Sequence, residues 1–293
     1  MFNESLGPDS FLKVPTQITR AELDGFRQLL YDEVGITLDQ SKRNMVTARL
    51  AKRLRALNIE SYSDYLAFLS TPLGRAKEID EFIDVMTTNK TEFFRERSHY
   101  DTLTSVVLPD LRSRMTPGED FFIWSAACST GEEPYSLAMH LYDHFLCVPE
   151  SYSVLATDIC QEALARARSA VYPDDVVEPV GRGPAHRFLL RGKGRKEGYW
   201  RVAPEIRKFV TFKRVNLMDE FFDLAQSPHT IWCRNVMIYF DAETKADLCR
   251  KFFRVLVPGG YLFIGHSESL NTISDDFVPI LPAVYRKPIG GAK

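Results

Sequence analysis

The sequence predicts a doubly wound, mainly parallel α/β sheet with a small antiparallel β insertion, preceded by an all-α domain. Three observations predict it. Residues 18–86 show helix-like spacing of apolar side chains, whereas from residue 121 onward short apolar runs alternate with helix-like segments, as in a parallel sheet. Residues 188–212 then hold consecutive strand-like runs with no helix between them, which is typical of antiparallel strands.

Composition and charge indicate a globular protein of about two domains, because the chain has 293 residues. A formal net charge of -2 argues against a generally basic protein that coats nucleic acid. No apolar run approaches the roughly 20 residues that span a bilayer, and the N-terminus does not resemble a signal peptide. The cysteines lack a CxxC pair, which indicates a reducing cytoplasm and no structural zinc; they are Cys128, Cys147, Cys160, Cys233 and Cys249.

The N-terminal part is expected to be a loose tail over residues 1–17, followed by a small helical domain over residues 18–86. Thr19 is placed to cap a first helix that ends at Gly35. The apolar spacing then predicts a second helix from Gln40 to Leu57 and two shorter ones. The shorter helices are expected at Ser63–Leu69 and Ala76–Met86.

The second helix is unusually basic, and no acid occurs between Ser41 and Ile59. A charged helix surface is often merely solvated. The absence of any interleaved acid favours the alternative, a docking surface for an acidic partner, either protein or nucleic acid. Its basic residues are Lys42, Arg43, Arg49, Lys52, Arg53 and Arg55.

The segment Thr87–Arg97 has two interpretations. Thr88 or Asn89 with Glu92 matches the pattern of a capping box, which on the residues alone predicts the start of a helix. The same hydroxyls, amide and arginine would also suit a linker that touches a cofactor.

The stretch from Phe121 to Leu141 predicts a strand, a tight turn and a helix, the corner at which doubly wound sheets bind cofactors. The turn has one glycine rather than the GxGxxG of a dinucleotide site, and Glu132 and Glu133 would repel a phosphate. This disfavours NAD, FAD and ATP and favours a nucleoside with a cationic group, such as S-adenosylmethionine. An ordinary strand-to-helix turn remains the alternative.

Two later strands are expected to end in polar residues. Residues 152–158 predict a strand that ends at Asp158, where an acid commonly binds ribose hydroxyls. Thr230–Phe240 predicts a strand that turns polar at Arg234 and Asn235. The other expected elements are helices at Ile159–Ser169 and Thr244–Leu256, insertion strands within Phe188–Asn216, and strands at Tyr261–Gly265 and Val284–Arg286.

Other chemical patterns are weaker. His140, His144 and Cys147 recur along one helix without a HExxH motif, and we expect them to pack structurally rather than to bind metal. His266 and Ser267 lack the nucleophile elbow of a hydrolase. No metal site is predicted.

Six runs of residues resemble the CheR-type chemotaxis receptor methyltransferases, which use S-adenosylmethionine to methylate glutamate side chains. The runs are TTNKTEFFRE, WSAACSTGEEPYS, ATD, VNL, CRNVMIYF and GHSE, in order and at similar spacing. The resemblance covers nearly the whole chain. It implies a helical receptor-docking domain at residues 18–86, a linker and helix at residues 87–115, and a methyltransferase domain at residues 116–293 with its insertion at about residues 188–212.

The resemblance also implies roles for particular residues. Arg95 and Tyr239 would steer the incoming carboxylate, with Tyr239 close to the transferred methyl group. Receptor docking would use Arg49, Lys52, Arg53 and Arg55, and a receptor's C-terminal peptide would bind at Arg191, Gly192, Gly194 and Arg195. The implied cofactor contacts are Asn89, Thr91, Arg95, Glu133, Asp158, Asn216, Leu217, Arg234 and Asn235.

The expected protein is therefore a cytoplasmic enzyme recruited to membrane receptor arrays, with S-adenosylhomocysteine as its product. It would bind the helical cytoplasmic region of chemoreceptors, without nucleic acid and without insertion into the membrane. The alternatives are a methyltransferase that acts on RNA or a small molecule, and a non-catalytic module that binds S-adenosylmethionine as a sensor.

Overall fold

The computed structural model describes residues 16–146 and 151–290 and divides the chain into two compact units. One unit runs to Glu33 and continues over Thr37–Thr87, and the other comprises Val34–Ile36 and the chain from Thr88 onward. Most of the expected N-terminal tail and Cys147 lie outside the described residues. Among the helices that are described, none combines the length and apolar character that crossing a membrane requires.

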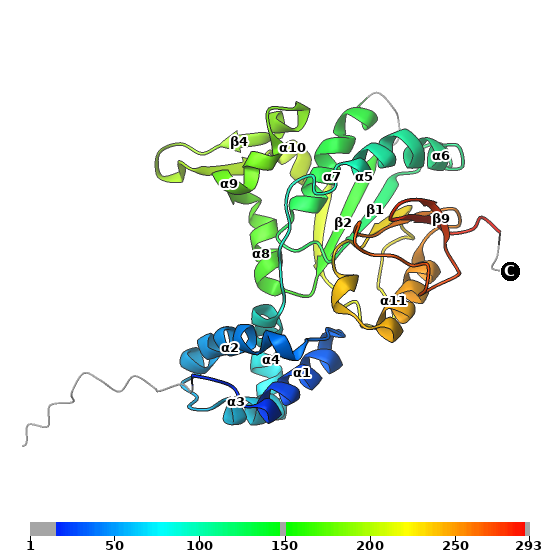
Figure 1. The fold of residues 1–293 in the computed structure, drawn as a ribbon. Coiled ribbons are helices and arrows are strands. Elements are labelled where there is room, and N and C mark those ends of the chain that lie inside the picture. The colour runs from blue at the N-terminus through cyan, green and yellow to red at the C-terminus, as the bar shows by residue number, and fades with distance from the viewer. Residues whose placement is uncertain (1–15, 147–150, 291–293) are drawn as a thin grey trace, which may run out of the picture. The chain divides into compact units, whose positions relative to one another are not determined.

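The first unit is entirely helical in its described part, as predicted (Figure 1). Thr19 caps the first helix reciprocally with Glu22: the backbone N–H of each residue is bonded to the side chain of the other. Gly35, at φ +69°, follows the end of this helix. The elements are α1 (Arg20–Val34), η1 (Gln40–Lys42), α2 (Arg43–Leu57), α3 (Tyr62–Leu69) and α4 (Pro72–Met86).

Part of the basic surface of α2 makes contacts inside this unit, so two of the expected docking residues, Arg49 and Arg53, also have a structural role. Arg53 makes a bidentate ion pair at 2.7 and 2.8 Å with Glu78 of α4, a residue that is only 3% exposed. Arg49 donates to the backbone carbonyls of Met86 and Thr87. Acids of α4 pair with Arg53, and Arg49 binds carbonyls at the end of the same helix, so both join α2 to α4. Lys52 and Arg55 lie exposed.

The second unit is built on a seven-stranded sheet in the order β6-β2-β1-β7-β8-β10-β9. Strands β6, β2, β1, β7 and β8 run parallel, and β10 and β9 are antiparallel additions. The predicted doubly wound, mainly parallel fold class is confirmed. The strands are β1 (Phe121–Ala126), β2 (Tyr152–Asp158), β6 (Val210–Arg214), β7 (Thr230–Trp232), β8 (Tyr261–Phe263), β9 (Val278–Leu281) and β10 (Val284–Arg286).

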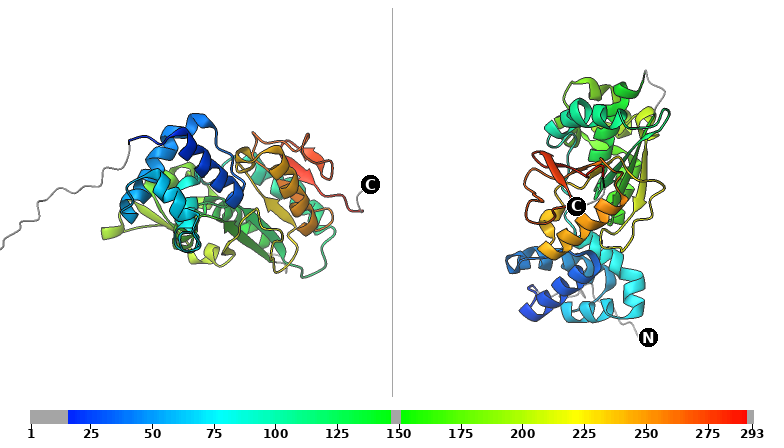
Figure 2. Two further views of the ribbon diagram at one scale, coloured as in Figure 1. Left: turned by 90° about the horizontal axis from the view of Figure 1, so that it is seen from below. Right: turned by 90° about the vertical axis from the view of Figure 1, so that its right-hand side faces the viewer.

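Helices cover both faces of this sheet because alternate strand residues point to opposite sides. Phe121 and Ile123 belong to the hydrophobic core under α7, whereas Trp124 and Ala126 belong to the core under α11 (Figures 1 and 2). The helical elements are α5 (Ser98–Thr102), the π-helical η2 (Leu103–Val107), α6 (Leu108–Arg112), α7 (Glu132–Tyr142), η3 (Asp143–Phe145), α8 (Gln161–Ser169), α9 (Asp174–Val177), η4 (Glu178–Val180), η5 (Pro184–Phe188), η6 (Gly194–Lys196), α10 (Pro204–Arg207), η7 (Met237–Tyr239) and α11 (Ala242–Val255).

The antiparallel insertion exists, but its strands differ from those expected. The three-stranded sheet has the order β3-β5-β4 and comprises β3 (Val171–Pro173), β4 (Leu189–Arg191) and β5 (Tyr199–Val202). The run FVTFKRVN, which was assigned to the insertion, instead forms β6 and pairs in parallel with β2. An alternating apolar run does not reveal whether its partner is the preceding strand or a distant one, so the expectation at residues 188–212 was wrong in extent.

The linker also corrects an expectation. No helix begins at Thr88 or Asn89; the chain is irregular until α5 starts at Ser98. Phe94 and Glu96 have φ values of +54° and +58°, in the left-handed region that breaks a helix.

Candidate functional site at the carboxyl edge of the sheet

The turn after β1 is fixed by the acid at the end of β2. One oxygen of Asp158 accepts the backbone N–H of Ser129 at 2.7 Å, and the other accepts that of Cys160 at 2.9 Å. Ser129 has φ +51°, and the carboxylate stabilises this left-handed backbone. The predicted ribose ligand therefore lies beside the predicted cofactor turn and also shapes it.

The start of α7 requires glycine and buries a glutamate. Gly131 has φ +96°, and a Cβ there would lie 2.8 Å from the Ala167 Cβ. Burial raises the pKa of Glu132, partly offset by a hydrogen bond from the Thr130 hydroxyl at 2.7 Å. This buried acid makes the helix end unfavourable for a phosphate, as the sequence indicated.

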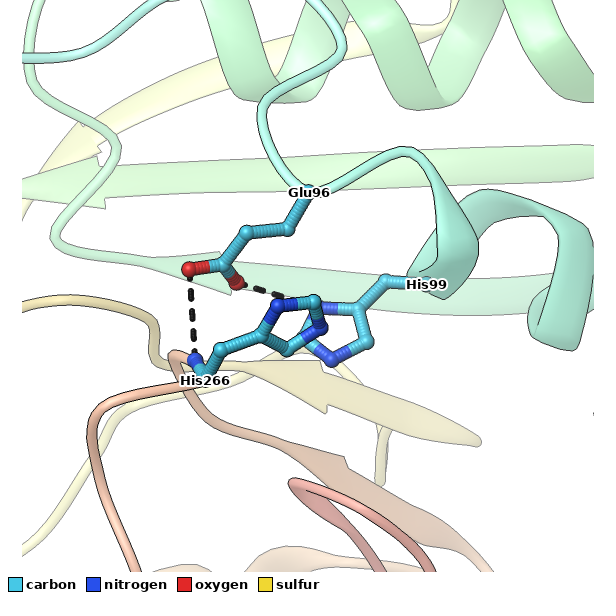
Figure 3. A group of neighbouring side chains, drawn as sticks. All are labelled: Glu96, His99 and His266. Carbon is cyan, nitrogen blue, oxygen red and sulfur yellow. Dashed lines mark hydrogen bonds and ion pairs between the residues drawn. The ribbon is translucent and has the colours of Figure 1, made fainter.

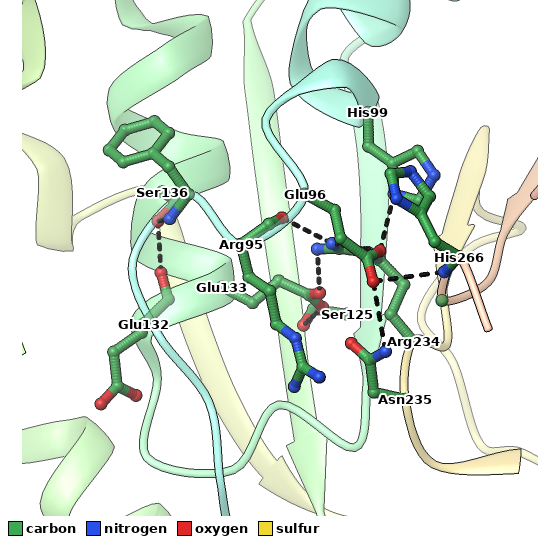
Figure 4. Close-up of polar contacts among 12 residues, drawn as sticks. Arg95, Glu96, His99, Ser125, Glu132, Glu133, Ser136, Arg234, Asn235 and His266 are labelled. Carbon is green, nitrogen blue, oxygen red and sulfur yellow. Dashed lines mark hydrogen bonds and ion pairs between the residues drawn. The ribbon is translucent and has the colours of Figure 1, made fainter. Parts of the chain in front are cut away.

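Arg234, which follows β7, is the centre of a buried ion-pair network (Figure 4). Its side chain is 1% exposed, and its two terminal nitrogens lie 2.9 Å from Glu133 and 2.8 Å from Glu96. It also donates to the backbone carbonyl of Arg95 at 2.5 Å. The guanidinium carbon lies 5.3 Å from the centre of the Trp232 ring. The network thus joins the linker, the first turn of α7 and the end of β7.

The charges in this network control two pKa values. Burial alone would raise the pKa of Glu96, but the hydrogen bond and positive charge of Arg234 lower it to about 2. Burial lowers the pKa of His99 to about 3, assisted by the same arginine. Glu96 is therefore ionised and His99 neutral near pH 7.

Glu268, in the GHSE run, holds the segment that follows Arg234. Its carboxylate accepts backbone N–H groups from Asn235 at 2.9 Å, Ile238 at 3.1 Å and Gly265 at 2.5 Å. Asn235 has φ +59°, and a Cβ at Gly265 would lie 2.3 Å from its amide nitrogen. Glu268 therefore fixes the backbone that leads to Tyr239.

The loop after β6 and the linker supply the remaining expected contacts. Lys251 of α11 donates to the carbonyl of Met218 at 3.1 Å and so supports Leu217, while the Asn216 side chain accepts the N–H of Met218. The Asn89 side chain donates to the Cys160 sulfur at 3.2 Å. A cavity of about 390 Å³ beside this contact is lined by Asn89, Thr91, Thr130, Glu132 and Tyr172, among others.

The structure brings most of the expected cofactor residues to the carboxyl edge of the sheet, whereas the residues expected to bind receptors lie elsewhere. Asp158 ends β2, Asn216 and Leu217 lie after β6, and Arg234 and Asn235 lie after β7, all at the carboxyl ends of parallel strands of one sheet. Glu133 and Arg95 join them through Arg234, and Tyr239 lies in η7. The expected tail-binding residues belong to the insertion, and the expected docking residues belong to the first unit: Arg191, Gly192, Gly194 and Arg195, and Arg49, Lys52, Arg53 and Arg55.

Sequence reasoning gave no role to Glu96, Ser129 and Glu268. Glu96 and Glu268 close two of the motif runs, TTNKTEFFRE and GHSE, and an acid that ends such a run was the available signal. Their function depends on distant backbone N–H groups and on Arg234.

The donor set suits a cationic nucleoside. Asp158 ends β2, where an acid in this type of sheet commonly binds ribose hydroxyls. The acids of the network outnumber its guanidinium, which favours a positive sulfonium over a pyrophosphate.

Comparison with known proteins agrees with this chemistry. The family models for the CheR methyltransferase all-alpha domain and SAM binding domain match residues 21–87 and 89–283. A chemotaxis protein methyltransferase of Salmonella typhimurium is 40% identical over 85% of this chain and 84% of its own length. The Escherichia coli K12 protein of the same name is 39% identical over 88% and 87%, and that of Borreliella burgdorferi is 37% identical over 92% and 95%. The chain belongs to the CheR methyltransferase family.

Proposed function

We propose that this protein transfers the methyl group of S-adenosylmethionine to glutamate side chains of chemotaxis receptors, giving glutamate methyl esters. The observation that carries the proposal is the convergence of Asp158, Arg234 and Asn235 at the carboxyl edge of the parallel sheet. Membership of the CheR family makes the chain an S-adenosylmethionine-dependent methyltransferase. The product is S-adenosylhomocysteine.

The reaction needs placement rather than acid–base catalysis. A glutamate carboxylate is ionised at pH 7 and is already a nucleophile, so no general base is required. The bound cofactor supplies an electrophilic methyl group. The chain aligns the carboxylate with that group and excludes water. Arg95 and Tyr239 are proposed to steer the carboxylate. Arg234 binds the backbone carbonyl of Arg95, and Glu268 binds the N–H of Ile238, the residue before Tyr239.

The cofactor site is proposed to use residues from the linker and from four strand ends. Asp158 would accept ribose hydroxyls in addition to its two backbone donors, because a carboxylate offers about four lone-pair sites. Glu133 would add negative charge opposite the sulfonium. The other proposed contacts are Asn89, Thr91, Arg95, Asn216, Leu217, Arg234 and Asn235.

Two surfaces are proposed for receptor binding. The exposed Lys52 and Arg55 of α2 would contact acidic helices in the cytoplasmic part of a receptor. The edge strand β4, whose Leu190 is 50% exposed, would accept a receptor's C-terminal peptide as an added strand near Arg191. Together they would recruit the enzyme to receptor arrays.

Transfer of tritiated methyl groups to receptor fragments tests the reaction. We expect incorporation that is released as methanol by base, because an ester is base-labile and a methylated nitrogen is not. RNA serves as a parallel substrate. Labelling of RNA, or base-stable labelling of the fragments, would contradict the proposal, and an Arg95→Ala variant should reduce the signal.

The peptide surface has its own test. A variant in which residues 191–196 are replaced by a short neutral turn should lose binding of receptor C-terminal peptides while keeping methyl transfer to tailless fragments, since tethering raises effective concentration alone. If no peptide binds the wild type more tightly than about 1 mM, a free energy near −4.1 kcal/mol, the insertion does not tether receptors.

A further inference from the structure

Next to the Arg234 network lies a cluster of two histidines and one glutamate (Figure 3). Glu96 comes from the linker, His99 from α5, and His266 from the segment after β8. One carboxylate oxygen of Glu96 and one ring nitrogen of each histidine all lie within 4.8 Å of one another. Three side chains with ligand atoms thus converge from two segments far apart in the chain, one at residues 96–99 and one at residue 266.

His99 lacks the hydrogen bonds that a buried imidazole normally makes. The residue is 2% exposed, and neither ring nitrogen has a hydrogen-bond partner among the described residues. Its Nδ1 lies 3.4 Å from Glu96 Oε2, and the rings of Trp232 and Phe263 pack against its other sides. Buried polar groups are nearly always satisfied, so an orphan of this kind indicates a missing water or ion.

His266 opens the cluster to solvent and has a supporting contact. The residue is exposed, and its Nε2 lies 3.3 Å from the hydroxyl of Ser98. Its backbone N–H donates to Glu96 at 3.2 Å. The Ser98 hydroxyl thus contacts the ring of His266, while the backbone of His266 binds the Glu96 carboxylate. Contacts of this kind orient metal ligands.

The nearby guanidinium is shared between two acids. Arg234 lies 2.8 Å from Glu96 Oε2 and 2.9 Å from Glu133. Two carboxylates therefore pair with one guanidinium. Glu96 Oε1 accepts hydrogen bonds from the His266 N–H and from the Asn235 side chain, and Oε2 accepts one from Arg234. Because a carboxylate has about four acceptor sites, one site remains on Oε2, the oxygen that faces His99 Nδ1.

We propose that Glu96, His99 and His266 bind one divalent transition-metal ion, with zinc as the fitting ion. Two imidazoles and a carboxylate match the His₂Glu donor set of zinc and disfavour magnesium and calcium, which prefer oxygen ligands alone. The ion ties the linker to the segment after β8. Because Glu96 is shared with Arg234, the ion also restrains the residue that holds the backbone of Arg95. This site goes beyond methyl transfer and takes no part in its chemistry.

The competing site is the pair His140 and His144, whose rings lie 5.9 Å apart one helical turn from each other. The experiment therefore uses full-length, tag-free, chelator-treated protein carrying His144→Ala as its background. Calorimetric titration with Zn²⁺ is compared between His144→Ala and His144→Ala/His266→Ala. Co²⁺ absorption in the visible range reports the ligand field independently. His266 is exposed, so its substitution should leave the melting temperature in chelator unchanged.

We expect one Zn²⁺ per chain in the His144→Ala background. Affinity should fall by at least about 10-fold in the double variant, because even outer partners of a metal site contribute that much. A Glu96→Gln variant in the same background should weaken binding similarly and reduce the Co²⁺ absorption. Equal Zn²⁺ affinities with and without His266 would overturn the site, as would binding no tighter than about 100 μM, a free energy near −5.5 kcal/mol.

Discussion

The parallel strands of the seven-stranded sheet are bordered differently at their two ends, the amino edge, where the strands begin, and the carboxyl edge, where they end. At the amino edge, His229 accepts the N–H of Phe122 at 3.0 Å and faces Glu119 at 3.0 Å, so each ring nitrogen of His229 has a single partner. At the carboxyl edge, Asp158 and Glu268 each accept several backbone N–H groups and hold left-handed residues in place. The contacts at the amino edge therefore only complete the hydrogen bonding of the sheet. Those at the carboxyl edge hold residues in unfavourable left-handed conformations and so fix an irregular surface for ligands.

Removing the guanidinium at the carboxyl edge should produce the largest effect. Arg234→Met leaves Glu96 and Glu133 buried without their counter-ion, so the free energy of unfolding should fall by about 3–5 kcal/mol. Urea unfolding at pH 7 measures it. Arg234→Lys keeps the positive charge but lacks the two terminal nitrogens that reach both acids. Its free energy of unfolding should lie between those of the wild type and Arg234→Met. A loss below about 1 kcal/mol for Arg234→Met would mean that the pairs contribute little.

At the same edge, Asp158→Ala should weaken cofactor binding in a protein that still folds. Losing hydrogen bonds to a charged group costs about 1.5–3 kcal/mol, or roughly 10- to 150-fold in the dissociation constant. Calorimetric titration with S-adenosylhomocysteine measures the change, with the exposed Asp175→Ala as control. Unchanged affinity would remove Asp158 from the cofactor site and weaken the contrast between the edges.

At the amino edge, His229→Gln should lower the free energy of unfolding by about 1–3 kcal/mol and leave the cofactor dissociation constant unchanged. Burial lowers the pKa of His229, partly offset by Glu119, so the unfolded chain takes up a proton first as pH falls below about 6.5. Wild-type stability should therefore decline from pH 7.5 to 5.5 more steeply than that of the variant. Parallel urea midpoints across this range, or a changed cofactor affinity, would contradict this assignment.

The smallest effect on activity is expected for substitutions on α2, which belongs to the helical unit and not to the sheet. Replacing Lys52 and Arg55 by alanine should slow receptor methylation by about 2- to 10-fold and spare both stability and cofactor affinity, because exposed ion pairs are weak. Added salt should slow the wild type similarly. Arg53→Ala is the contrasting variant and should destabilise the first unit by leaving Glu78 unpaired. Normal methylation by the double variant with no salt response would show that these charges are merely solvated.

The sequence by itself determined the local elements of the site. The apolar run, the small-residue turn and the acidic helix start predicted β1, its turn and α7, because each depends on side chains a few residues apart. The strand ending at Asp158 and the last strand, Val284–Arg286, were placed for the same reason. The motif runs then identified the family, and with it the cofactor.

Tertiary structure alone decided which strand pairs with which and which charges meet. The run that became β6 has the same alternation whether it pairs with β5 or β2, and only the closed sheet selects β2. Arg234 meets Glu96 across 138 residues of chain, and Arg53 meets Glu78 across 25. Such pairs carry no local periodicity, because a buried charge needs a partner in space rather than at a fixed spacing in sequence.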